Sequence, residues 1–131
     1  TEEIFTLISK DKKSIHLEEF MKFPKSFENE QLNKKWIELK KIRDICNISI
    51  EAKRASKEIG SSLETNLIIS LNKNLIELIK NIDMAELCIT SAAEIIETTN
   101  NETTAQTKKA EGEKCSVCWK ITKNGCARHP N

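Results

Sequence analysis

Asn29 to Glu58 reads NEQLNKKWIELKKIRDICNISIEAKRASKE, and this stretch carries the strongest periodic signal in the chain. Its apolar residues recur at steps of three or four, which places them on one face of an α-helix. The pattern predicts a long helix over residues 29–58, with Trp36 in the core rather than on a recognition surface. Gly60, which can adopt positive φ, is the expected stop signal. The apolar residues are Leu32, Trp36, Leu39, Ile42, Cys46 and Ile50, with Ile45, Ile48 and Ala52 beside them.

The remainder of this helix is charged, with eight basic and five acidic side chains. Such a surface suits either a solvated face of a core helix or a face that contacts RNA, and the residues leave both open. The candidate RNA contacts on this helix are Lys53, Arg54 and Lys57.

Shorter patterns on either side predict the remaining elements and an α+β fold. Pro24 interrupts an irregular segment, and alternating apolar residues from Leu67 to Leu71 indicate a strand with one buried face. The expected elements are a helix over residues 1–8, an extended segment over 10–27, strands over 67–71 and 87–92, a helix over 75–82, a loop or hairpin over 97–107 and a third, weaker strand over 105–110.

The composition narrows the class of protein. The 131 residues suffice for one domain or two very small ones, and 38% hydrophobic but only 5% aromatic residues imply an aliphatic core. No apolar run is long enough to predict a membrane span, and no signal-peptide pattern is present. Five cysteines, three of them close to His129, favour metal thiolates in a reducing cytoplasm over a disulfide framework. Cys46 and Cys88 stand singly within apolar patterns.

The net charge of +1 conceals an uneven distribution. Residues 1–60 carry a net charge of +2, residues 61–113 of −5 and residues 114–131 of +4. The first and last of these segments are therefore the parts expected to face a polyanion. Catalysis is not expected, because the sequence has no Ser-His-Asp order, no His-Glu-x-x-His motif and no phosphate-binding glycine loop.

Lys114 to Asn131, KCSVCWKITKNGCARHPN, has the spacing of a metal-binding knuckle. Cys115 and Cys118 form a Cys-x-x-Cys pair, which lets two thiolates hold one tetrahedral ion, usually zinc. Cys126 and His129 have the same spacing and would close a Cys3His site across a seven-residue connection. Three alternatives stay open: a second ligand pair beyond residue 131, a redox-active cysteine pair, and no metal binding at all.

The knuckle is also the best candidate for RNA contact. Each cation near a phosphate backbone adds salt-dependent affinity, and an indole can stack on an unpaired base. Trp119 could equally cover the metal site and make no RNA contact. The candidate tRNA-binding residues here are Trp119, Lys120, Lys123 and Arg128.

Several strings resemble, in order, the C-terminal region of bacterial-type isoleucyl-tRNA synthetases. They are Ser14–Phe20 (SIHLEEF), Trp36–Asn47 (WIELKKIRDICN), Ala52–Glu64 (AKRASKEIGSSLE) and Ala110–Trp119 (AEGEKCSVCW). The resemblance implies the end of a helical anticodon-binding domain over residues 1–60, a small α/β module with two or three strands over 61–113, and a zinc-finger segment over 114–131.

The resemblance further implies a cytoplasmic role in protein synthesis with zinc as cofactor, and no membrane. The partners would be tRNA(Ile) and the remainder of the synthetase, whose catalytic domain would bind ATP and isoleucine. The HIGH and KMSKS-type motifs of that domain are absent from this sequence, so the chain alone is expected to be non-catalytic.

The family's finger uses two Cys-x-x-Cys pairs, and only the first, at Cys115 and Cys118, matches. On that alignment His129-Pro130 precedes the second pair, Cys126 is not a ligand, and the finger is truncated, as expected of a chain cut from a longer protein.

Two rival functions remain. A stand-alone zinc-ribbon module that binds protein would be closed by Cys126 and His129, and it should bury Phe5, Phe20 and Phe23 in its own core. A nucleic-acid enzyme with a glycosylase-type zinc finger shares only the knuckle with this sequence.

Overall fold

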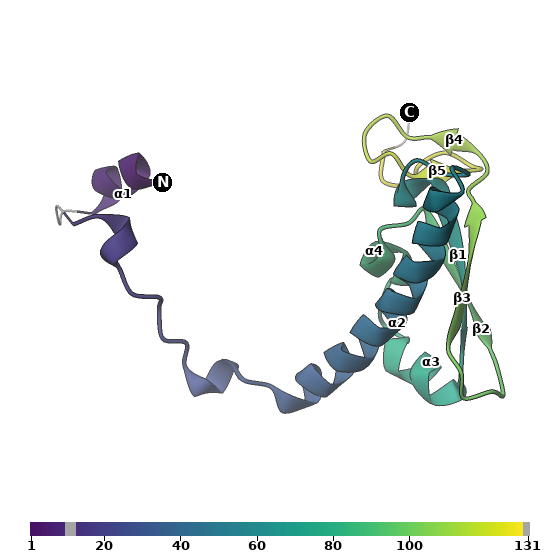
Figure 1. Ribbon diagram of the computed structural model, residues 1–131, viewed down its shortest axis with the longest axis horizontal. Coiled ribbons are helices and arrows are strands. Elements are labelled where there is room, and N and C mark those ends of the chain that lie inside the picture. Colours follow the sequence, from purple (N-terminus) through teal and green to yellow (C-terminus); the bar gives the residue numbers. More distant parts are fainter. Residues whose placement is uncertain (10–12, 130–131) are drawn as a thin grey trace. The chain divides into compact units, whose positions relative to one another are not determined.

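The computed structural model describes residues 1–9 and 13–129. It consists of two compact units, Thr1–Glu30 and Gln31–Asn131. Within the described residues, no helix is both long and apolar enough to cross a membrane. The elements are labelled in Figure 1, and each unit is described by itself.

The first unit is a series of short helical turns. Helix α1 spans Glu2–Ile8, and two 3-10 turns, η1 (Ile15–Leu17) and η2 (Lys25–Phe27), follow. The Glu2 carboxylate accepts a hydrogen bond from the Ile15 amide at 3.1 Å. The expected helix over 1–8 and the largely irregular segment after it are confirmed, except that residues 10–12 lie outside the described residues. The unit buries little of its apolar surface, since Phe20 is fully exposed and Phe23 is exposed too.

Helix α2 (Glu30–Ala55) confirms the long periodic pattern, but only its second half is covered. Leu39, Ile42, Cys46 and Ile50 are buried, at the spacing that the sequence predicted. The prediction that Trp36 belongs to the core is wrong within the described residues, because this side chain is 43% exposed. The elements that pack against α2 bury its residues only from Leu39 onward.

The end of α2 differs from the prediction. Lys57, not Gly60, adopts the left-handed conformation, with φ 59°. The Lys57 and Glu58 amides donate to the Arg54 and Lys53 carbonyls, which is the hydrogen-bond pattern of a Schellman motif. Gly60 instead donates its amide to the Glu64 carboxylate at 3.0 Å.

A three-stranded sheet follows, with strand order β2-β1-β3. The strands are β1 (Thr65–Leu71), β2 (Ala92–Glu97) and β3 (Thr104–Lys109). Strand β1 pairs parallel with β2 and antiparallel with β3. The predicted first and third strands are confirmed. The hairpin alternative for residues 97–107 is wrong, because β2 and β3 lie on opposite sides of β1 (Figure 1).

Two helices connect β1 to β2, namely α3 (Lys73–Ile79) and α4 (Met84–Cys88). The predicted strand over residues 87–92 is therefore wrong. The Asp83 side chain accepts hydrogen bonds from the Ala85 and Glu86 amides and so starts a helix, whose buried residues Met84 and Cys88 are one turn apart. Ile89, with φ 56°, ends that helix, and the strand begins only at Ala92.

One face of the sheet carries the core. Strand β1 alternates between buried and half-buried residues, and Leu67, Ile69 and Leu71 pack in one cluster with the apolar stripe of α2. The Ser49 hydroxyl on α2 lies 2.8 Å from the Thr107 hydroxyl on β3, and Arg43 of α2 donates to the Leu87 carbonyl of α4. The helices therefore cover the face on which Leu67 lies, and Asn66, Ile68 and Ser70 lie on the other face.

The chain ends in a second, two-stranded sheet of β4 (Glu113–Lys114) and β5 (Ile121–Thr122). Gly112 makes this hairpin feasible. Its φ is 129°, and a Cβ atom there would lie 2.3 Å from the Thr122 carbonyl oxygen. Only glycine fits at that position. Gly125 also has positive φ, 80°, but its surroundings are open.

The two glycines provide a matched pair of variants. Gly112→Ala is expected to disrupt the β4–β5 hairpin, whereas Gly125→Ala should introduce only the strain of a left-handed residue, roughly 1–2 kcal/mol. Hydrogen exchange of the Cys115 amide, which donates to the Lys120 carbonyl across the hairpin, measures this difference. Equal exchange rates in the two variants would contradict the role given to Gly112.

Candidate metal centre

The hairpin and the segment after it bring four metal-ligating side chains together. They are Cys115, Cys118, Cys126 and His129, whose ligand atoms all lie within 4.8 Å of one another. Cys115 and Cys118 lie in the turn between β4 and β5, and Cys126 and His129 follow β5. Pro130, which with His129 resembles the segment before the family's second ligand pair, lies outside the described residues.

The separations between these atoms suit a tetrahedral ion. The Cys118 and Cys126 sulfurs are 3.5 Å apart, and His129 Nδ1 lies 3.6 Å from the Cys115 sulfur and 3.5 Å from that of Cys126. A tetrahedron with zinc–sulfur bonds of about 2.3 Å and zinc–nitrogen bonds of about 2.0 Å has edges of roughly 3.5–3.8 Å. The four residues are therefore close enough to hold one metal ion.

The backbone of the first turn favours a thiolate at Cys115. The Cys118 and Val117 amides donate toward its sulfur, and these hydrogen bonds lower the pKa of the Cys115 thiol to about 6. The turn is closed by the Trp119 amide, which donates to the Cys115 carbonyl, and Trp119 adopts φ 64°. Hydrogen bonds to the Cys126 and Cys115 sulfurs raise the pKa of the His129 imidazole. A metal ion would take the place of the proton that these groups share.

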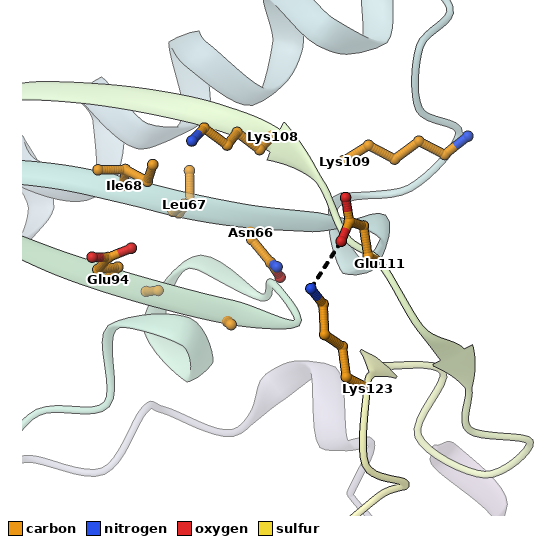
Figure 2. Close-up of a pocket in the computed structure, with 10 residues that line it drawn as sticks. Asn66, Leu67, Ile68, Glu94, Lys108, Lys109, Glu111 and Lys123 are labelled. Atoms are coloured by element: carbon orange, nitrogen blue, oxygen red, sulfur yellow. Dashed lines mark ion pairs between the residues drawn. The ribbon is translucent and has the colours of Figure 1, made fainter.

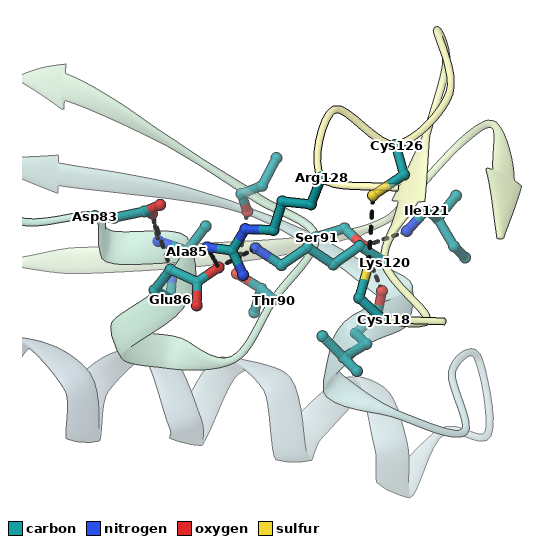
Figure 3. Close-up of polar contacts among 12 residues, drawn as sticks. Asp83, Ala85, Glu86, Thr90, Ser91, Cys118, Lys120, Ile121, Cys126 and Arg128 are labelled. Carbon is teal, nitrogen blue, oxygen red and sulfur yellow. Dashed lines mark hydrogen bonds and ion pairs between the residues drawn. The ribbon is translucent and has the colours of Figure 1, made fainter. Parts of the chain in front are cut away.

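The described part of the knuckle, residues 114–129, is held against α4 by one carboxylate (Figure 3). Glu86 pairs with Lys120 and, at 3.0 Å, with Arg128. These two cations lower the pKa of the Glu86 carboxyl, with the Lys120 hydrogen bond as the largest cause. Lys120 follows the first ligand pair and Arg128 lies within the second, so Glu86 holds both arms of the knuckle.

Ser91 makes a second attachment, at the start of the loop into β2. Its hydroxyl donates to the Leu63 carbonyl and accepts the Ile121 amide of β5 at 2.7 Å. Neither Glu86 nor Ser91 was identified from the sequence, because their partners lie about 30 residues away and no local pattern marks them.

The predicted RNA contacts fall into two groups. Lys120 and Arg128 share Glu86, and Lys123 pairs with Glu111 at 2.9 Å. Trp119 is different, because its indole is 59% exposed and the Lys114 ammonium lies 5.7 Å from the ring centroid.

Two of the three candidate RNA contacts near the end of α2 also form ion pairs with neighbouring acids. Lys53 pairs with Glu58 at 2.8 Å, and Arg54 pairs with Glu51 at 2.6 Å. Lys57 occupies the left-handed position after the helix.

The remaining cysteines form a separate pair. Cys46 of α2 and Cys88 of α4 are both buried, and a hydrogen bond between the thiols, together with burial, raises the pKa of Cys46. The sequence placed them singly in apolar patterns, and the structure packs them against each other in the core.

Removal of the charge on Glu86 should loosen the knuckle. We expect Glu86→Gln to release bound metal to a chelator roughly threefold faster, because two partly exposed ion pairs that orient the ligand arms are lost. Glu77→Gln on α3, whose pairing with Lys80 is 3.7 Å long and far from the ligand sequence, is the control. Identical release rates for the two variants would show that Glu86 does not orient the site.

Comparison with known proteins places this chain in context. No family model matches it. It is 68% identical over 129 residues to an isoleucine–tRNA ligase of Pelagibacter ubique, an alignment that covers 98% of the chain and 14% of that ligase.

More distant relatives agree. An isoleucine–tRNA ligase of Bartonella henselae is 35% identical over 122 residues, covering 85% of the chain and 13% of the ligase. One of Agrobacterium fabrum is 32% identical over 133 residues, covering 93% of the chain and 14% of the ligase. The chain thus spans about one seventh of the length of these relatives. Along nearly its whole length, it corresponds to the C-terminal region of the isoleucine–tRNA ligase family.

Proposed function

We propose that this chain is the C-terminal tRNA-binding portion of an isoleucine–tRNA ligase. In that role it contributes to the ATP-dependent attachment of isoleucine to tRNA(Ile) in the cytoplasm, without carrying the chemical step. The observation that supports this most strongly is the 68% identity to such a ligase over 98% of the chain. The sites for ATP and isoleucine would lie in the rest of the synthetase.

We propose zinc as the ion of the knuckle. Three thiolates and one imidazole form one of the ligand sets that hold zinc in structural sites. The ligands would be Cys115 and Cys118 together with Cys126 and His129, because their ligand atoms all lie within 4.8 Å of one another and three of the separations match tetrahedral edges. The bound ion would fix the turn that presents Trp119 and would serve a structural purpose. This set departs from the two Cys-x-x-Cys pairs that the family resemblance implied.

Trp119 is the strongest of the proposed RNA contacts. An exposed indole beside a cation offers a face for an unpaired base and a charge for its phosphate. The other proposed contacts, Lys120, Lys123 and Arg128 on the knuckle and Lys53, Arg54 and Lys57 at the end of α2, are weaker. All but Lys57 already pair with a carboxylate, so RNA would have to compete for them.

The rival function, a stand-alone protein-binding module, receives less support. Such a module should bury Phe5, Phe20 and Phe23 in its own core, yet Phe20 and Phe23 are exposed and Phe5 is only partly buried. We propose that the rest of the synthetase covers them. On this proposal, residues 1–60 belong to the end of the anticodon-binding domain, 61–113 to a small α/β module and 114–131 to the zinc finger.

Metal analysis of variants tests the ligand set. Native mass spectrometry should find one zinc per chain, and Cys126→Ser and His129→Ala should each reduce this because a ligand is lost. Ser116→Ala changes an exposed residue of the same turn and should keep the ion. One zinc per chain in both ligand variants would show that other groups complete the site.

A tRNA-binding measurement tests the role of Trp119. We expect Trp119→Ala to weaken binding of tRNA(Ile) by about tenfold, because stacking on one base contributes roughly 1–3 kcal/mol. Val117→Ala removes another exposed apolar side chain of the same turn and should have little effect. If the two variants bind tRNA equally, the indole is not a contact.

A further inference from the structure

One peptide group of the knuckle is held at both of its ends. Its carbonyl, from Lys120, accepts the Cys115 amide at 2.9 Å. Its N–H, from Ile121, donates to the Ser91 hydroxyl at 2.7 Å, a contact that Figure 3 includes. Ser91 in turn donates its proton to the Leu63 carbonyl. The hydrogen bonds therefore run without a break from a candidate metal ligand to the chain before β1.

The orientation of this peptide group bears on both members of the first ligand pair. It receives the Cys115 amide directly, and the Lys120 amide, one bond earlier in the chain, donates toward the Cys118 sulfur. Hydrogen bonds that are joined in a chain polarise and strengthen one another. A group that fixes the Ile121 amide therefore helps to fix the two thiols as well.

The other end of the chain of hydrogen bonds lies in the core of the second unit. The Ser91 amide donates to the carbonyl of Thr65, the first residue of β1, at 3.0 Å. Its neighbour Thr90 is fully buried. Leu63, which accepts the hydroxyl proton, belongs to the 3-10 turn η3 (Ser62–Glu64) directly before β1. The hydroxyl thus refers the position of the knuckle to the start of the central strand.

A side chain at residue 91 has to donate and accept at the same point. It receives the Ile121 amide and gives a proton to the Leu63 carbonyl, and both bonds are partly buried. A serine or threonine hydroxyl does both with one atom. Without the hydroxyl, an amide and a carbonyl would lose their partners, which destabilises their present arrangement.

The ion pair of Glu111 and Lys123 flanks the same hairpin but holds it less firmly (Figure 2). Its contact of 2.9 Å joins side chains that are 78% and 70% exposed. Water and salt screen such a pair. The partly buried hydrogen bonds of Ser91 are better suited to fix the hairpin.

We propose that Ser91 is a positioning residue of the metal centre, whose hydroxyl holds the Lys120–Ile121 peptide so that the Cys115 and Cys118 thiolates face one ion. The inference rests on the proposed metal binding by the knuckle. It goes beyond that proposal by assigning the arrangement of the ligands to a residue 30 positions before Ile121. Because such coupling is reciprocal, a bound ion should in turn stabilise the hydrogen bonds of Ser91.

Removal of the hydroxyl tests the proposal. Ser91→Ala should lower the affinity for zinc, measured by competition with a chromophoric chelator, by about tenfold, because groups that orient metal ligands have effects of roughly this size. Ser49→Ala is the matched control, since it also removes a partly buried hydroxyl contact, but one between α2 and β3. It should leave the affinity unchanged. Unchanged affinity in Ser91→Ala would overturn the proposal.

A cobalt spectrum separates positioning from a general loss of stability. Co²⁺ bound in place of zinc absorbs visible light in a way that depends on the geometry of its ligands. Ser91→Ala should alter this spectrum, Ser91→Thr should restore it because the hydroxyl is kept, and Ser49→Ala should leave it as in the unaltered chain. If Ser91→Thr behaves like Ser91→Ala, the hydroxyl is not the cause and the proposal is wrong.

Hydrogen exchange of the Ile121 amide tests the reciprocal effect. Zinc should slow this exchange in the unaltered chain and have much less effect in Ser91→Ala. Equal slowing by zinc in both would overturn the coupling.

The failure of this inference can be told apart from the failure of the proposed function. If the unaltered chain binds one zinc ion and Ser91→Ala binds it equally well, only the role of Ser91 is disproved. If the unaltered chain binds neither zinc nor cobalt, the proposed metal site fails as well.

Discussion

The packing of α2 against β1 is the contact on which the rest of the second unit depends. Leu39, Ile42, Cys46 and Ile50 form the buried stripe of the helix, and Leu67, Ile69 and Leu71 oppose it from the sheet. Side chains of this kind contribute roughly 1.5–3 kcal/mol each when fully buried. Because the strand alternates, burying Leu67 on one side turns Asn66 and Ile68 to the other, and the open face of the sheet follows from the same contact.

The elements with a strong local period were predictable from the sequence. The stripe of α2 and the alternation of β1 each repeat often enough to determine the element and its buried face. The segment from Met84 to Thr90 was not, because a short apolar run suits a strand or a helix equally. The Asp83 cap decides in favour of a helix, and a cap of one residue is easily missed.

The candidate metal site was predictable because its ligands lie close together in sequence with a recognised spacing. The contacts that hold the knuckle in place could not be predicted, because Glu86 and Lys120 are 34 residues apart in the sequence. The same contact changes the interpretation of the basic residues. In the sequence they stand in a segment of net charge +4, yet in the structure two carboxylates, Glu86 of α4 and Glu111, pair with three of its four cations. Net charge along the sequence therefore overstated the cations that RNA could contact.

The left-handed turn at Ile89 has a consequence for how this chain could be altered. A β-branched residue at φ 56° is strained, and the side chain is 54% exposed, so its packing does not explain its presence. The turn positions Thr90 and Ser91 for their hydrogen bonds. These bonds depend on the backbone conformation at residue 89 and not on its side chain. Asparagine accepts that conformation with less strain. A substitution at residue 89 could therefore change the stability of the fold without altering the ligand cluster of the knuckle or the open face of the sheet.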